Sequence, residues 1–218
     1  MIDQIMIDHR RFPMTSNGSL ATRLKKETAS LHLSVEEQLD LPDSVRTKAE
    51  YADLLRRLLI FHGAFEAALA FPKWSGEWSR IGITLGDHTR SPELIHDFAY
   101  FNQATGLREV PEEVSLSFTT FAQALGGLYV IEGSSLGGKI LAPLFRAHLG
   151  EIPTRYYESY GRNHPQPWRS VQSALARFEQ EYEDADEVII GAAVTFRTFG
   201  RHLAVSRRQT SEPLNNLV

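Results

Sequence analysis

The sequence predicts an all-α protein, a single domain built as a bundle of about six to eight helices. Three observations predict this class. Apolar residues recur at spacings of three and four positions over most of the chain, and helix-start and helix-stop signals bracket these stretches. No segment shows the alternation of a convincing strand or hairpin, because the best candidate, Arg80–Leu85, is short.

The first helix is predicted over residues 19–39. Its apolar positions follow one helical face: Leu24, Thr28, Leu31, Val35 and Leu39. Pro42 follows, and it disfavours helical geometry in the residue before it. A second helix begins at the capping box of Thr47 and Glu50 and runs to the stretch FPKWSG.

Further helices are predicted over 91–101, 114–148, 167–182 and 186–205. Ser91 is the expected cap of the first of these, with Pro92 at its first helical position. Pro143 is expected to kink the long helix. Residues 76–90 and 150–167 read as loop-like connections.

Composition limits the function classes. The 218 residues carry a net charge of −4 and no cysteine, which excludes disulfides and thiolate metal ligands and gives no sign of nucleic-acid binding. The chain starts without the basic and apolar regions of a secretion signal, and no apolar run reaches the ~18 residues of a membrane span. We therefore expect a cytoplasmic protein without membrane contact, with tails at 1–16 and 208–218 and one helical domain over 17–207.

The stretch LGGLYVIEGSSLGGKIL, residues 125–141, places five glycines in a helical pattern: Gly126, Gly127, Gly133, Gly137 and Gly138. At roughly 1 kcal/mol each, they should weaken the helix by about 4–5 kcal/mol. Gly126, Gly133 and Gly137 share one face with Tyr129. Such a bare face admits either a closely packed helix or a flat ligand, and the glycines alone do not choose between them.

The first helix holds a second constellation. His32 lies where the apolar face meets a charged face, with Lys25 in nearly the same direction about 10 Å along the axis and Glu36 one turn further on. An imidazole with an ammonium two turns away suits a ligand that has a metal centre and an anionic edge. The alternative is an ordinary histidine at a helix border among unrelated surface charges.

Together the two constellations resemble the heme oxygenases, especially the bacterial ones. The resemblance rests on RLKKETASLHLSVEEQ (23–38), followed about a hundred residues later by LGGLYVIEGSSLGG (125–138), and extends to PWRSVQSALARF (167–178) and AAVTF (192–196). It covers most of residues 19–205 and implies the single-domain multi-helix bundle of that family.

The resemblance implies these heme contacts: Lys25, His32, Tyr129, Gly133, Gly137, Gly138 and Arg169. His32 would be the proximal ligand of the heme iron, while Lys25 and Arg169 would pair with propionates. Gly133, Ser134 and Gly137 would form the catalytic distal surface. Ser134 departs from the animal enzymes, which have an aspartate there, so the resemblance does not carry over a proton-delivery route.

The family's reaction converts heme, O2 and reducing equivalents to biliverdin, carbon monoxide and ferrous iron. An external electron donor, such as a ferredoxin or a flavoprotein reductase, would be needed, since the sequence has no flavin or nicotinamide motif. The alternative is a non-catalytic heme carrier or sensor on the same scaffold. The bare glycine face argues against it, because a carrier has no need to leave the distal side open.

Overall fold

The computed structural model describes residues 18–105, 114–158 and 167–204, and every regular element in these ranges is a helix. The predicted all-α class is therefore confirmed. The predicted tails, 1–16 and 208–218, lie outside the described residues. Within the described part, no helix combines the length and the apolar content that crossing a membrane requires.

The first two helices form as the capping signals predict. Helix α1 (Leu20–Leu39) starts where the Ser19 side chain accepts a hydrogen bond from the backbone of Thr22, and it ends at Asp40, which adopts the left-handed conformation (φ 47°). Helix α2 (Lys48–Leu69) starts at the predicted capping box, in which Thr47 and Glu50 bond to each other's backbone.

The segment after α2 is more regular than its sequence predicts. The expected loop contains α3 (Ser75–Arg80) and the 3-10 turn η4 (Leu85–His88), and the turn η3 (Pro72–Trp74) precedes them. The expectation of a loop was wrong because Trp78 and Ile81 are buried, and Trp78 donates from its ring nitrogen to the carbonyl of Leu69 at 3.0 Å. Tertiary packing fixes turns that are too short to leave a periodic pattern.

Helix α4 (Ser91–Thr105) begins one residue before Pro92, the predicted first helical position. Ser91 is not its cap as predicted, because the Ser91 hydroxyl has no hydrogen-bond partner among the described residues. Instead, Glu66 of α2 accepts from the backbone of Arg90 and Ser91 at 2.7 and 2.9 Å.

Helix α5 (Phe121–Leu149) begins later than the predicted start at residue 114, because Thr120 caps it by accepting from the backbone of Gln123 at 3.2 Å. It then continues through Pro143. The predicted connection after α5 holds the one-turn helix α6 (Arg155–Glu158).

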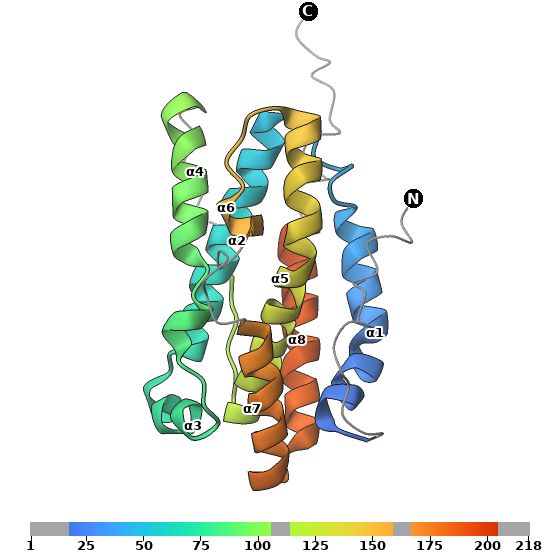
Figure 1. The fold of residues 1–218 in the computed structure, drawn as a ribbon, viewed down its shortest axis with the longest axis vertical. Coiled ribbons are helices and arrows are strands. Elements are labelled where there is room, and N and C mark those ends of the chain that lie inside the picture. The colour runs from blue at the N-terminus through green and yellow to red at the C-terminus, as the bar shows by residue number, and fades with distance from the viewer. Residues whose placement is uncertain (1–17, 106–113, 159–166, 205–218) are drawn as a thin grey trace, which may run out of the picture.

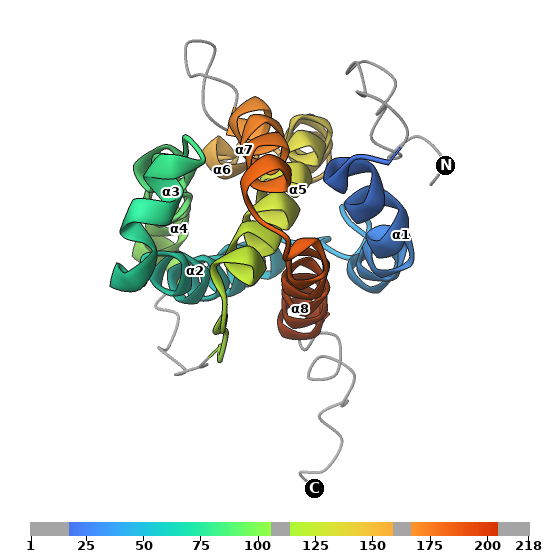
Figure 2. The same ribbon diagram turned by 90° about the horizontal axis from the view of Figure 1, so that it is seen from below.

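Helices α7 (Pro167–Glu181) and α8 (Ala185–Ala204) agree with their predicted ranges within one residue. Helix α5 runs through the middle of the bundle, with α8 packed along it and α1 packed on α8 (Figures 1 and 2). On the other side α2 packs against α4, while α6 and α7 contact α5. Figure 1 shows α5 changing direction about halfway along its length.

The buried side chains form two clusters rather than one. The first includes Phe65, Leu125 and Phe178, and the second includes Tyr51, Phe145 and Tyr157. Phe199 packs against both clusters. The bundle is therefore divided inside, and the division coincides with a cavity.

Candidate functional site

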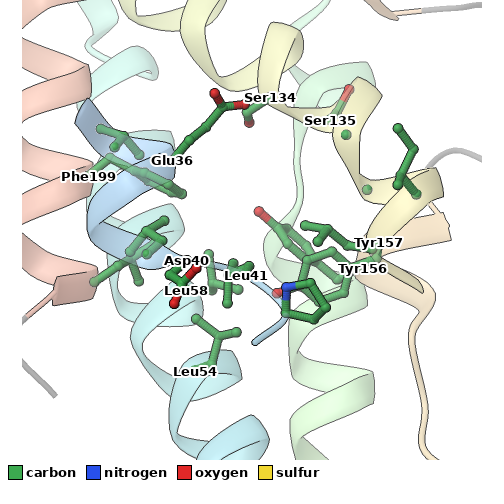
Figure 3. A pocket seen from close by; sticks show the side chains of 18 of the residues that line it. Glu36, Asp40, Leu41, Leu54, Leu58, Ser134, Ser135, Tyr156, Tyr157 and Phe199 are labelled. Atoms are coloured by element: carbon green, nitrogen blue, oxygen red, sulfur yellow. The ribbon is translucent and has the colours of Figure 1, made fainter. Parts of the chain in front are cut away.

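A cavity of about 600 Å³ lies between α1, α2, α5, α6 and α8. In Figure 3, Glu36 of α1 and Ser135 of α5 lie on either side of the open space. Most of the lining is aliphatic or aromatic and comes from both core clusters: Leu54, Leu58, Val130, Ile131, Tyr156, Tyr157, Phe196 and Phe199. The volume and the apolar lining suit an organic ligand of cofactor size.

His32 enters this cavity from α1. Its ring meets the ring of Phe196 edge-on, with centroids 5.7 Å apart, and its Nδ1 lies 3.5 Å from a carboxylate oxygen of Glu36. Glu36 is therefore the acidic neighbour of the imidazole on its Nδ1 side. No hydrogen-bond partner to Nε2 exists among the described residues, which leaves that nitrogen for a ligand.

The predicted glycine face of α5 divides between two uses. A Cβ added at Gly137 would meet nothing within 4 Å, and this residue lines the cavity. A Cβ at Gly126 would overlap the backbone of Val188 in α8, and one at Gly138 would overlap the backbone of Tyr157. Close helix packing thus explains Gly126 and Gly138, whereas Gly137 keeps the cavity wall bare.

Two serines stand beside Gly137 on the cavity wall. The Ser134 hydroxyl donates to the carbonyl of Ile131 at 2.8 Å, and the Ser135 hydroxyl donates to the carbonyl of Glu132 at 2.7 Å. Hydroxyls that bond back to the preceding turn loosen and bend a helix. The serines, the glycines and Pro143 inside the helix all favour bending of α5.

Some of the predicted site residues lie away from the cavity. Lys25 and Arg169 are exposed, and neither lines it. Tyr129 packs on Trp168 with ring centroids 5.4 Å apart, and a Cβ at Gly133 would also meet Trp168, at 3.5 Å. Burial raises the pKa of Tyr129 to about 12. The structure thus brings together His32, Ser134, Gly137 and Gly138, and these four line one cavity.

The cavity has a polar end at His62, a residue that the sequence does not single out. His62 is buried, and its Nε2 shares a hydrogen bond of 2.9 Å with the Tyr156 hydroxyl. Burial, with a smaller contribution from the nearby Arg90 cation, lowers the pKa of His62 to about 3, so its imidazole is neutral near pH 7. The available signal was a histidine set between Phe61 and Phe65 in an apolar stripe.

Arg90 and Tyr157 complete this polar end. The Arg90 guanidinium lies 4.8 Å from the centre of the Tyr156 ring and donates to the Tyr156 carbonyl. The Tyr157 hydroxyl is buried without a hydrogen-bond partner among the described residues, and burial raises its pKa well above the usual value. The cavity therefore offers the Arg90 cation and the neutral side chains of His62 and the two tyrosines at one end, and His32 at another wall.

The potential metal ligands in the cavity favour a metal that is already coordinated by an organic ligand over a bare metal ion. Within the described ranges, no group of three or more His, Asp or Glu side chains could hold a bare metal ion. His32 is a single nitrogen donor in an apolar cavity, which suits a metal whose remaining ligands come from a macrocycle. The open space at Gly137 admits a flat ring against the α5 backbone.

Comparisons with known proteins agree with this chemistry. The family model described as heme oxygenase matches residues 18–204. A protein named heme oxygenase from Xanthomonas campestris pv. campestris (strain 8004) is 30% identical over 161 residues, which span 72% of this chain and 91% of that protein. The solved structure of the NO- and CO-bound heme oxygenase from Neisseria meningitidis superposes with a TM-score of 0.64 at 20% identity, covering 93% of this chain and all of that one.

Proposed function

Because this chain belongs to the heme oxygenase family, we propose that it cleaves heme with O2 and external electrons to biliverdin, carbon monoxide and ferrous iron. Heme binding and heme degradation are the properties of the family. The specific products, the residues that act and the electron donor are the parts proposed here. A cytoplasmic location, where reduced electron donors are present, belongs to the same proposal.

The observation that carries the proposal is the pairing of His32 and Gly137 at one cavity. His32, with Glu36 beside it, would bind the iron through Nε2. Gly137 would let the ring lie against the backbone of α5. Gly133 and Gly138, whose Cβ positions face Trp168 and Tyr157, would keep α5 close to α7 and α6 beside it. When bound, heme supplies both the iron that activates oxygen and the ring that is oxidised.

The charges around the cavity favour one orientation of the anionic edge of heme. The carboxylates of Glu36, Glu37, Asp40 and Asp43 line the cavity at the C-terminal end of α1. Propionates are repelled from that side. Lys25 lies two turns before His32 on the same helix, and Arg169 is an exposed cation of α7. Both lie outside the cavity, so we assign them to propionates that project from its mouth.

Ser134, His62 and Tyr129 have roles that follow from their hydrogen bonds, protonation and packing. Ser134 stands at the cavity wall, and its hydroxyl could exchange its bond to Ile131 for one to a water. His62 is neutral and shares a proton with Tyr156, so it supplies a polar partner without a buried charge. Tyr129 would act indirectly, by holding Trp168 against α5.

A stable carrier or sensor of heme is the second candidate, because it needs the same His32 and the same cavity. The bare wall at Gly137 favours catalysis, since a carrier gains nothing from an open distal side. The two candidates differ in whether bound heme survives reduction in air.

The deciding experiment adds one equivalent of hemin to the purified protein, then ascorbate or a ferredoxin system in the presence of catalase. We expect the Soret band to decay while biliverdin absorbance and carbon monoxide appear. His32→Ala is the control and should lose the histidine-type heme spectrum. A wild-type oxy-heme spectrum that persists would contradict catalysis and identify a carrier, and the absence of any Soret shift would refute the heme site.

A further inference from the structure

A second buried polar cluster lies behind α5, outside the cavity lining. Glu132 of α5 has no exposed surface, and its Oε1 lies 2.9 Å from Nδ1 of His88 in η4, whose side chain is 2% exposed. On its other side, Nε2 of His88 lies 3.2 Å from the hydroxyl of Ser170 in α7. Three separate elements therefore meet at one histidine.

The hydrogen bonds fix the direction of this chain of groups. The Ser170 hydroxyl donates to the carbonyl of Pro167 at 2.8 Å, so its oxygen accepts from Nε2–H of His88. One proton must then lie between Nδ1 of His88 and Oε1 of Glu132, because two lone pairs would repel at 2.9 Å. The Ser170 hydroxyl therefore donates its proton to Pro167 and not to His88. Because no base accepts that proton, Ser170 is not an activated nucleophile.

Glu132 lies in the part of α5 that combines glycines with serines bonded back to the preceding turn. Ile131, next to Glu132, and Ser134, two positions further on, line the cavity. Gly133, Gly137 and the back-bonded serines loosen the helix there. A loosened helix needs an external attachment to keep one shape. His88 supplies that attachment, and neither His88 nor Glu132 lines the cavity.

We propose that Glu132 is a positioning residue. Held by His88, which is bonded in turn to Ser170, it fixes residues 131–138 of α5 against η4 and α7. It thereby keeps the cavity wall in one conformation for its ligand. The identity of that ligand rests on the proposed function above. The attachment itself is a property of the protein alone and is tested without heme.

The experiment measures hydrogen exchange in the ligand-free protein for wild type, Glu132→Gln and Asp53→Asn. Asp53 is the matched control, because its pairs with Arg56 and Arg57 lie within α2 and none of these three residues lines the cavity. We expect Glu132→Gln to speed exchange of residues 131–138 by about tenfold, and Asp53→Asn to leave this segment unchanged. Unchanged exchange in Glu132→Gln, or an equal increase in both variants, overturns the proposal.

A milder variant covers the case in which Glu132→Gln does not fold. Ser170→Ala removes only the outer bond, and we expect about threefold faster exchange in the same segment; no change would contradict the proposal.

Hemin titration then separates this inference from the function. We expect Glu132→Gln, or Ser170→Ala in its place, to bind hemin more weakly than Asp53→Asn does, and equal binding would overturn the link to the cavity wall. If wild type does not bind hemin, the proposed function fails while the exchange result still decides whether Glu132 fixes α5.

Discussion

At the scale of single residues, the cavity depends on polar groups that are buried in the neutral state. His62 is the clearest case, because its ring is enclosed by apolar neighbours and shares one hydrogen bond with Tyr156. A buried imidazole binds a proton less readily than the same imidazole in the unfolded chain. The stability of the protein must then depend on pH through this residue.

The sign of that dependence follows from the pKa of His62, which burial lowers from 6.5 to about 3. Between these values the unfolded chain binds a proton that the folded protein does not bind. His62 therefore imposes no proton-linked penalty above pH 6.5, and it destabilises the fold progressively as the pH falls below 6.5 towards 3, by up to about 1.4 kcal/mol per pH unit.

The substitution His62→Gln keeps a polar side chain that does not titrate. Between pH 6.5 and pH 5 we expect wild type to lose about 2 kcal/mol more unfolding free energy than this variant, measured by urea denaturation. Equal losses in the two proteins would show that His62 is not held neutral. His148, which is exposed, offers the control substitution His148→Gln, and we expect it to follow wild type.

At the scale of elements, the sequence predicts those helices whose ends carry their own signals. Ser19 and Thr47 mark two helix starts because a side-chain oxygen or a capping box lies in the local sequence, whereas the start of α4 is capped by Glu66 from α2. The start of α5 was misplaced because Thr120 caps it with no charged partner to mark it. The short helices α3 and α6 were not predicted, because long-range contacts, such as those of Trp78 and Tyr156, stabilise them.

The candidate site was predictable to the same extent. His32 and Gly137 follow from local patterns on two helices, and both line the cavity. The partners of His62 and Glu132 come from α6 and η4, elements far along the chain that the sequence did not predict. No local sequence pattern predicts these contacts, because they depend on how the helices pack.

The two uses of glycine in α5 give opposite expectations for substitution by alanine. Gly137→Ala places a methyl group in open space, so the better helix propensity of alanine should raise the unfolding free energy of the ligand-free protein by about 0.5–1 kcal/mol. Gly126→Ala places it against the backbone of Val188, so overpacking should lower that free energy by about 1–3 kcal/mol. Urea denaturation measures both.

For hemin binding we expect the opposite sensitivity, with substitution at Gly137 harmful and Gly126→Ala tolerated. Gly137→Leu should fold and yet bind hemin at least about tenfold more weakly, because its side chain occupies the space of the ring. Gly126→Ala should bind hemin normally once folded. Normal hemin binding and turnover in Gly137→Leu would contradict the assignment of this glycine to the heme face.

At the scale of the whole molecule, the cavity separates the two core clusters, which then meet mainly through residues such as Phe199. A ligand that fills this space touches side chains of both clusters and adds apolar contacts between them. Ligand binding should therefore stabilise the entire bundle and not the site alone.

We expect hemin at a hundredfold excess over its dissociation constant to raise the unfolding free energy by about 2.7 kcal/mol, or the melting temperature by roughly 5–10 °C. Thermal denaturation followed by circular dichroism measures the shift. His32→Ala should show a much smaller shift at the same hemin concentration. An equal shift in this variant would mean that hemin binds elsewhere on the protein.

The divided core also bears on how long a molecule survives in a cell. If the bound substrate connects the two core clusters, the protein is most stable while substrate is present. Its unfolding free energy falls when the substrate has been consumed. Proteases act on the loosened form, and a difference of about 1–2 kcal/mol changes cellular abundance several-fold. We expect the amount of this protein to follow the supply of its substrate after synthesis, without a separate regulator, because the cavity between the two clusters, lined by Val130 on one side and Leu58 on the other, is left for the substrate to fill.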